Sequence, residues 1–499
     1  MSNNLRKGAL SSILLVVDGI AKKLVGLVST LILARVLLPE DFGIIAIASL
    51  MVNFILVLSD AGSKVYLLRV DNLDSDKVNT SWTINFILKS TVSIIMIIGS
   101  FYIDDFYGDP RITPILISLT VVFFFNSFEN PGLAFLRRDQ NYTKIVKLTV
   151  TTKIISVIFA VTAALILKNY WALVIAQATS AFFMIVGSYI ICPTKPKFML
   201  KNTREQWQFS GWMIPQALFG YFRSHLATFI VSSSFGQAVL GSFQTMKYIA
   251  FIPSSFIIQP IGEPFLVELA NSKGTSGYFA KQFKASFILL MLVALPISSV
   301  MYFNHGLVTA LILGDNWTDY SYLMSAFGLL IPAYVMLQHG TRALLVYGKT
   351  KQMFFYDCIA FVSIYGVLFA HGMDEIKSFS FLLVGMENLL AGLYFLFILL
   401  RYTGLKSTLT FVVSIIPLII GTIGGHLFSD YIRIDEVNIF VDLLLVTFSN
   451  TVAFFLIIFC LYIMGFKKFS EWEYLISLLL RIVNPVLSIF KHKDGHNIK

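Results

Sequence analysis

Long apolar stretches fill nearly the whole chain, and they constrain the fold more than any motif does. A helix rises about 1.5 Å per residue, so each stretch is long enough to cross the roughly 30 Å hydrocarbon core of a bilayer. Charged residues make up only 13% of the chain, whereas soluble proteins average about 25%. The sequence predicts an all-α polytopic membrane protein with fourteen transmembrane helices, at residues 9–34, 42–63, 80–103, 112–130, 145–167, 170–192, 210–233, 238–261, 285–305, 320–341, 353–371, 378–400, 408–429 and 438–465.

Seven basic residues lie inside the first eight of these stretches: Lys22, Lys23, Lys89, Lys147, Lys153, Arg223 and Lys247. A basic side chain at the bilayer centre costs about 2.5–3.5 kcal/mol, so seven of them facing lipid would cost about 20 kcal/mol. That exceeds the stability of about 5–15 kcal/mol that proteins have. We therefore expect these side chains to face a hydrated cavity or counter-charges, which is typical of a transporter for an anionic cargo.

Loop charges predict the orientation, because short cytoplasmic loops carry most of the Lys and Arg residues. With the amino terminus inside, the cytoplasmic segments include Arg137, Arg138, Lys195, Lys197 and the basic tail. The opposite face carries only Arg35, Arg111, Lys168, Lys377 and Arg433. This asymmetry predicts an even number of spans and two cytoplasmic termini. It also explains the net charge of +10 as attraction to anionic membrane lipids, so nucleic-acid binding is not expected.

A weak internal repeat indicates the domain organisation. Its copies are LILARVLLPEDFG (31–43) and FIVSSSFGQAVLG (229–241), with Gly43 and Gly241 in register at an offset of 198 residues. Parallel repeats place a transport site between their lobes. We therefore expect two parallel-repeat six-helix lobes around a central cavity, at 1–205 and 206–405, followed by two helices at 406–465. The segment 466–499 is predicted to be a cytoplasmic tail, with residues 471–490 lying along the membrane interface.

Four segments carry a resemblance to a known family: 31–62 (LILARVLLPEDFGIIAIASLMVNFILVLSDAG), 134–142 (AFLRRDQNY), 169–182 (NYWALVIAQATSAF) and 236–253 (GQAVLGSFQTMKYIAFIP). They resemble polysaccharide-export flippases of the Wzx and WzxC-like branch of the multidrug/oligosaccharidyl-lipid/polysaccharide (MOP) exporter superfamily. The resemblance implies alternating access around a cationic cavity. It implies as cargo an undecaprenyl-pyrophosphate-linked oligosaccharide, moved from the cytoplasmic to the periplasmic leaflet of the bacterial inner membrane for O-antigen, capsule or exopolysaccharide synthesis. Other polysaccharide assembly proteins are implied partners.

The expected substrate-binding residues of this cationic cavity are Lys22, Lys89, Lys153, Arg223 and Lys247. An arginine can bind phosphate in a bidentate manner, whereas a lysine acts as a point charge. The candidates for an ion pair or for coupling are Asp18, His225 and Glu387. No catalytic residue, metal ligand or cofactor is expected. In the span 210–233 the family tends to carry Asp and Gly where this chain has Ala227 and Ser232, so coupling details are not carried over.

Structural roles compete with these assignments. Asp18 and Lys22 are spaced i, i+4 and can pair on one helix, whereas Lys147 lies near a helix end and can extend to the interface. The other bases can be fixed by backbone carbonyls, and His225 can be a hydrogen-bonded interior residue. Two other functions also compete: a small-molecule exporter of the same superfamily, and a membrane glycosyltransferase or O-antigen polymerase. An exporter of cationic drugs would need acidic residues in its cavity, which this chain largely lacks. A glycosyltransferase or polymerase would need a large non-cytoplasmic loop, and this chain has none of that size.

Overall fold

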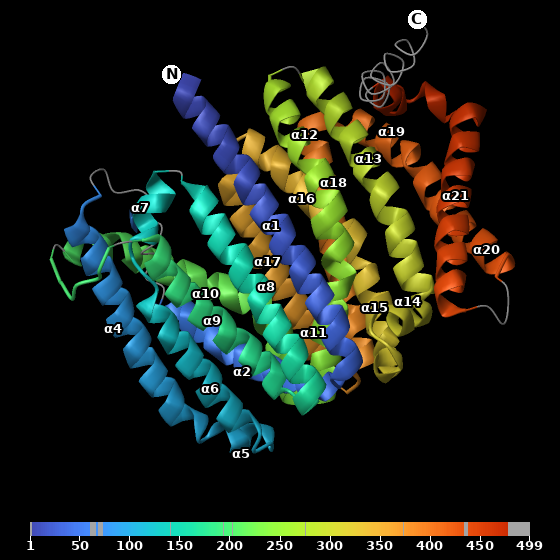
Figure 1. Ribbon diagram of the computed structural model, residues 1–499. Helices are drawn as coiled ribbons and strands as arrows, with labels where there is room; N and C mark the ends of the chain where they lie inside the picture. Colours follow the sequence, from blue (N-terminus) through green and yellow to red (C-terminus); the bar gives the residue numbers. More distant parts are fainter. Residues whose placement is uncertain are drawn as a thin grey trace, which may run out of the picture. The chain divides into compact units, whose positions relative to one another are not determined.

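The computed structural model consists of helices joined by short connections (Figure 1). All regular elements in the part of the chain that the structure describes are helical, which confirms the all-α class. The described residues are 2–59, 66–67, 73–139, 141–192, 194–201, 203–274, 276–372, 374–433 and 438–477.

Eleven helices within the described residues are long and apolar enough to cross a membrane, which confirms a polytopic membrane protein. They are α2 (Pro39–Ser59), α4 (Ser75–Ser100), α8 (Tyr142–Leu167), α9 (Trp171–Ile191), α11 with α12 (Gln237–Asn271), α13 (Ser276–Phe303), α15 with α16 (Ser321–Val346, after the short helix Asp315–Tyr320), α17 (Thr350–His371), α18 (Ile376–Thr403), α19 with α20 (Leu405–Tyr431) and α21 (Ile439–Met464). The number of fourteen spans stays a prediction.

Three of the expected spans are not among these eleven. The helix α6 (Ile112–Phe125) and the turn that follows it are apolar but shorter. The helices α1 (Ser2–Val36) and α10 (Thr203–Ser234) are long, but polar side chains interrupt their apolar sequence. Lys22 and Lys23 in α1 and Arg223 in α10 are among these interruptions.

The chain forms two compact units, Met1–Thr245 and Met246–Lys499. The division falls inside α11, because the first turns of that helix pack on α2. The predicted lobes at 1–205 and 206–405 rest on the repeated sequence, and that assignment stays a prediction.

In the first unit, α1 packs along α8, and α8 forms a hairpin with α9 (Figure 1). The buried contact joins Leu33 and Leu37 of α1 to Ala160 and Ala164 of α8 and to Ala172 of α9. The small alanine side chains let helix backbones approach closely in a membrane protein. Elsewhere in the unit, α2 packs against α4, α6 and α10.

In the second unit, α13, α16 and α18 meet around stacked rings. The Phe283 ring lies 4.5 Å from the His339 ring, and the Phe287 ring lies 4.2 Å from the Phe395 ring. The hairpin of α20 and α21 (Figure 1) attaches to α13, where Asn450 Nδ2 donates to Ser299 Oγ at 3.0 Å.

The start of the predicted tail is anchored to the second unit. Lys284 of α13 and Glu471 are both buried, with their charged atoms 3.8 Å apart, and the Trp472 indole donates to the Ser414 carbonyl at 2.9 Å. Residues 471–477 are helical. The rest of the predicted interfacial segment lies outside the described residues.

Candidate functional site

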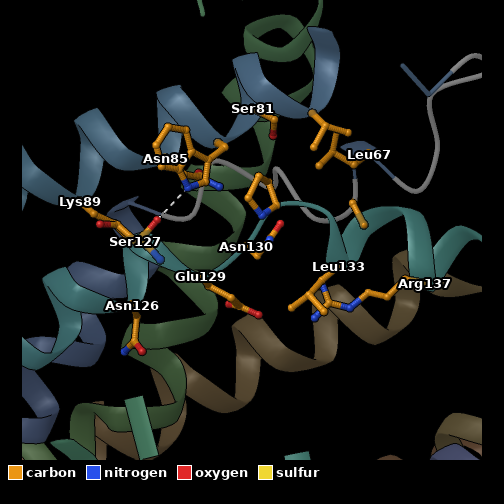
Figure 2. Close-up of a pocket in the computed structure, with 14 residues that line it drawn as sticks. Leu67, Ser81, Asn85, Lys89, Asn126, Ser127, Glu129, Asn130, Leu133 and Arg137 are labelled. Carbon is orange, nitrogen blue, oxygen red and sulfur yellow. Dashed lines mark hydrogen bonds between the residues drawn. The ribbon is translucent and has the colours of Figure 1, made fainter. Parts of the chain in front are cut away.

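A polar pocket of ≈ 90 Å³ lies in the first unit against α4 (Figure 2). One wall is the α4 face that carries Ser81, Asn85 and Lys89, and the other is the connection from α6 to α7 (Leu133–Arg138). The lining residues are Leu67, Val78, Ser81, Trp82, Asn85, Lys89, Asn126, Ser127, Glu129, Asn130, Pro131, Leu133, Ala134 and Arg137. Lys89, predicted as a substrate-binding residue, therefore lines a real cavity.

Hydrogen bonds fix the wall opposite α4. The Asn130 amide donates to the carbonyls of Cys192 and Thr194 at 3.1 and 2.8 Å, and its oxygen accepts from the Gly132 amide at 2.8 Å. The Trp82 indole donates to the Ser127 carbonyl at 2.9 Å, which ties this wall to α4. A pocket held in this way is preformed.

Two basic side chains and one acid give the pocket its charge. Lys89 lies about midway along α4, with its ammonium 5.5 Å from the centre of the Phe123 ring. Arg137 lies on α7 in a loop that the sequence predicts to be cytoplasmic, and Glu129 lies on the wall facing α4. The pocket thus extends from mid-helix toward this loop and has a net positive lining.

A second basic group lies between α1 and α8. Asp18 is only 8% exposed and accepts a hydrogen bond from Thr149 Oγ1 at 2.6 Å. Lys22 pairs with the same carboxylate at 2.5 Å. The ion pair that the i, i+4 spacing suggested is therefore present.

Lys153 belongs to this group by its register. It follows Thr149 by one turn of α8, just as Lys22 follows Asp18 by one turn of α1. The two helices run parallel, because the bond between Asp18 and Thr149 near one end is matched by contacts of Leu33 with the end of α8. Lys22 and Lys153 therefore share one level. Lys153 is half-buried, and none of the residues that the structure describes bonds to it.

The remaining predicted site residues lie elsewhere. Arg223 is exposed on α10, and His225 lies one turn from Tyr221, whose ring is 4.4 Å from the imidazole. Lys247 on α11 and Glu387 on α18 are both half-buried in the second unit. The structure thus groups Asp18, Lys22 and Lys153, and places Lys89 in a separate pocket.

The two copies of the sequence repeat meet in the first unit. A Cβ atom on Gly43 would lie 1.8 Å from the Gln237 carbonyl oxygen, and one on Gly241 would lie 1.9 Å from the Pro39 carbonyl oxygen. Pro39 and Gln237 are also 198 residues apart (237 minus 39), and they begin α2 and α11. Contacts that are reciprocal in this way indicate a local twofold relation.

Arg111 closes the same region, and the sequence analysis missed this role. Its guanidinium bonds to Asp109 at 2.7 Å, to Gln237 at 3.2 Å and to the Glu40 carboxylate. These bonds lower the pKa of Asp109 and raise the pKa of Arg111. The available signal was the turn sequence GDPR at 108–111, where Asp109 accepts from the Arg111 amide at 2.8 Å. We call this region the seam: Pro39, Glu40, Gly43, Asp109, Arg111, Gln237 and Gly241.

The sequence analysis also missed buried polar residues of the second unit. Lys284, His339 and Arg342 lie within apolar helices and are buried. His339 Nε2 lies 2.9 Å from the Phe283 carbonyl oxygen and 3.2 Å from Ser286 Oγ. Lys284 and Arg342 lie one residue outside the predicted spans 285–305 and 320–341, and His339 lies inside the last turn of the second span. Charged residues at span ends are expected to reach water, so the sequence analysis did not predict their burial.

Comparison with known proteins identifies relatives in polysaccharide synthesis. The family model described as "Polysaccharide biosynthesis protein" matches residues 32–322. The chain is 22% identical to an uncharacterized membrane protein in the cps region of Klebsiella pneumoniae, over 50% of this chain and 51% of that protein. It is 19% identical to the lipopolysaccharide biosynthesis protein WzxC of Escherichia coli K12 (46% and 47%) and 20% identical to the succinoglycan biosynthesis transport protein ExoT of Rhizobium meliloti (46% and 47%). The chain thus spans about half the length of the curated relatives it matches.

Solved structures share the fold. The lipid II flippase MurJ in an inward closed conformation aligns with a TM-score of 0.68 at 13% identity, over 90% of this chain and 99% of that one. An inward-facing multidrug resistance MATE family transporter of the MOP superfamily aligns with a TM-score of 0.52 at 12% identity, over 78% and 96%. Because the family model matches more than half of the chain, the predicted resemblance to polysaccharide-export proteins is confirmed, and the protein belongs to the polysaccharide biosynthesis protein family.

Proposed function

We propose that the protein is a flippase, which moves an anionic lipid-linked oligosaccharide from the cytoplasmic to the periplasmic leaflet of the bacterial inner membrane. The proposed carrier is undecaprenyl pyrophosphate, and the proposed product is a surface polysaccharide. The relatives named for lipopolysaccharide and succinoglycan biosynthesis support this proposal, as does the fold shared with a lipid II flippase. These relatives support transport and give no support to a glycosyltransferase or polymerase.

The observation that carries the proposal is the unneutralised charge of Lys153. Asp18 is already engaged by Lys22 and Thr149, so Lys153 on the same level keeps its charge without a described partner. A pyrophosphate carries two or more negative charges and needs compensation within a membrane. Cationic drugs would be repelled here, which disfavours the alternative of a multidrug exporter.

The roles of individual residues belong to the same proposal. Lys22, Lys89, Lys153, Arg223 and Lys247 would contact the cargo pyrophosphate at stages of its passage. Asp18, His225 and Glu387 would pair with these bases or couple transport to an ion. Other polysaccharide assembly proteins would supply and receive the cargo.

The test is the fate of lipid-linked glycans in a strain that lacks the gene. We expect complete lipid-linked units to accumulate and surface polysaccharide to fall, with both restored by the wild-type gene. Lys153→Gln should fail to restore export at normal protein abundance. Lys147→Gln is the matched control, because Lys147 is exposed on the same helix. Normal export without accumulation in the deletion strain would refute the proposal.

The proposed orientation has its own test. In a cysteine-free background, single cysteines at Asp105 and Asp315 should react with an impermeant thiol reagent in intact cells. Cysteines at Arg138 and Lys197 should react only after the membrane is permeabilised. Labelling of intact cells at Arg138 would reverse the proposed orientation while leaving the fold unaffected.

A further inference from the structure

Arg342 of α16 is a buried cation in the second unit that has no hydrogen-bond or ion-pair partner among the described residues. Only 7% of its surface is exposed, within a helix apolar enough to span a membrane. None of the described residues forms a hydrogen bond or ion pair with its guanidinium. Glu263 and Tyr334 act on it electrostatically but do not bond to it. Arginine stays protonated in proteins, and an uncompensated buried charge strongly destabilises a fold.

A glycine makes room for this guanidinium. A Cβ atom built on Gly262 of α12 would lie 2.5 Å from Nη2, 2.8 Å from Cζ and 2.8 Å from Nη1 of Arg342. The end of the Arg342 side chain therefore approaches α12 closely at Gly262, in space that any larger residue would fill. The contact with Gly262 positions the guanidinium, and none of the described residues accepts a hydrogen bond from its N–H groups.

The helix that carries Gly262 is irregular just before this point. Residues Ser254–Ile258 form a π-helical turn between α11 and α12. Such turns insert an extra residue and are frequent at functional sites. The α11 end packs on α16 through Phe251 and Tyr334, whose ring centres are 5.9 Å apart. The turn therefore sets which face of α12 is presented to Arg342.

The helices α12 and α16 run parallel, because Phe251 contacts Tyr334 and Gly262 meets Arg342 further along both chains. At the end toward which they run, Lys273 lies over the Tyr347 ring at 5.8 Å. A second cation thus stands where these helices end.

We propose that Arg342, held against Gly262, binds a phosphate-group anion in the second unit. A planar guanidinium with free N–H groups can bind phosphate oxygens in a bidentate manner. The phosphate can belong to an anionic lipid headgroup or to a soluble or lipid-linked phosphate. The proposal concerns binding, so it can hold or fail independently of the proposed transport function.

Binding is measured on the full chain in phosphatidylcholine nanodiscs, with inorganic pyrophosphate as the probe and thermal unfolding as the readout. We expect pyrophosphate to raise the Tm of the wild type in a saturable way. In Arg342→Gln the apparent affinity for pyrophosphate should fall about tenfold or more. The affinity of Arg342→Lys should be intermediate, because lysine keeps the positive charge but lacks the planar guanidinium that binds two oxygens at once. Equal stabilisation of the wild type and Arg342→Gln, or none in either lipid environment described below, would overturn the proposal.

Gly262→Ala tests the site without removing the charge. The new methyl group meets the end of a flexible side chain, so the guanidinium should be displaced while the protein still folds. We expect pyrophosphate affinity to fall about as much as in Arg342→Gln. The matched control is Gly392→Ala on α18, where a Cβ atom meets nothing within 4 Å. Unchanged affinity in Gly262→Ala would contradict the proposal that Arg342 binds the anion while it is held against Gly262.

The source of the phosphate is distinguished by repeating the titration with phosphatidylglycerol in the nanodiscs. If a lipid headgroup occupies the site, this lipid alone should raise the Tm of the wild type but not of Arg342→Gln, and pyrophosphate should add little. If the site takes a soluble or cargo phosphate, the pyrophosphate response should persist unchanged.

Glu263 provides the test of a purely structural role. If Glu263 were the true partner of Arg342, Glu263→Gln would leave the cation uncompensated and lower the Tm without pyrophosphate. If an anion is the partner, removing this nearby negative charge should strengthen pyrophosphate binding and leave the Tm without pyrophosphate unchanged or higher. The first result would contradict the proposal.

Discussion

The seam of the first unit and the Arg342 site of the second each bring an arginine and a glycine together between packed helices. In the seam, Arg111 is 42% exposed and has three side-chain partners, and its neighbouring glycines face backbone carbonyls. At the second site, Arg342 is almost fully buried and has no described partner, and the end of its side chain lies close to Gly262.

The two arginines differ in whether their charge is already neutralised by neighbouring side chains or is available to a ligand. An arginine that is saturated by carboxylates and an amide contributes to stability and has little capacity left for a ligand. A buried arginine without acceptors destabilises the protein until something binds. The same residue types therefore predict opposite responses to mutation in the two regions.

The largest expected effect is on the glycines of the seam. Gly43→Ala or Gly241→Ala would place a methyl group on a backbone carbonyl, which cannot move aside without separating α2 from α11. We expect a loss of about 3 kcal/mol or more in the free energy of unfolding, measured by thermal unfolding in nanodiscs. Gly99→Ala in α4 is the control, because its Cβ atom meets nothing within 4 Å. A wild-type Tm in Gly43→Ala would show that this contact opens freely.

The next effect contrasts the two arginines without added anion. Arg111→Met removes the partner of Asp109 and Glu40 and should lower the free energy of unfolding by at least about 1 kcal/mol, since Arg111 and Glu40 are partly exposed whereas Asp109 is buried. Arg342→Met removes an uncompensated charge and should leave stability unchanged or raised. Parallel unfolding measurements check both. A larger loss in Arg342→Met than in Arg111→Met would reverse the comparison.

Lys153 is a cation of the first unit that, unlike Arg111, has no described partner. Lys153→Gln should leave protein abundance normal but reduce export, because the lysine has no described partner to lose. Asp18→Asn should lower abundance, since it removes the partner of Lys22 and the acceptor of Thr149. Adding Lys22→Gln should recover part of that loss. Immunoblotting with polysaccharide assays gives both values, and low abundance of Lys153→Gln would assign it a structural role.

The smallest effect is the pH dependence of the seam. The hydrogen bond from Arg111 lowers the pKa of Asp109. A carboxyl whose folded pKa is depressed contributes stability that is present above its unfolded pKa of about 3.9 and is lost as pH falls through the folded pKa. The Tm difference between wild type and Asp109→Asn should therefore be constant above about pH 5 and shrink below about pH 4. A difference that does not change with pH would mean that Asp109 and Arg111 do not pair as ions.

The helical membrane class and the family were predictable from the sequence, because both rest on local patterns. An apolar run of sufficient length must become a helix in a bilayer, whatever its neighbours are. The segment at 31–62 and its companions carry the family resemblance in consecutive residues. The pair of Asp18 with Lys22 was predictable for the same reason, since one helical turn separates them.

The sequence did not predict which charged side chains are buried or which residues they pair with. Arg111 and Gln237 are far apart in sequence, and so are Gly262 and Arg342, so only helix packing brings each pair together. The sequence determined which segments are apolar enough to span a membrane and that basic residues lie within them, because hydropathy and charge belong to each residue. The tertiary structure decided which of those charges are neutralised, because the interaction between charges depends on their distance in space and on the solvent that packing leaves around them.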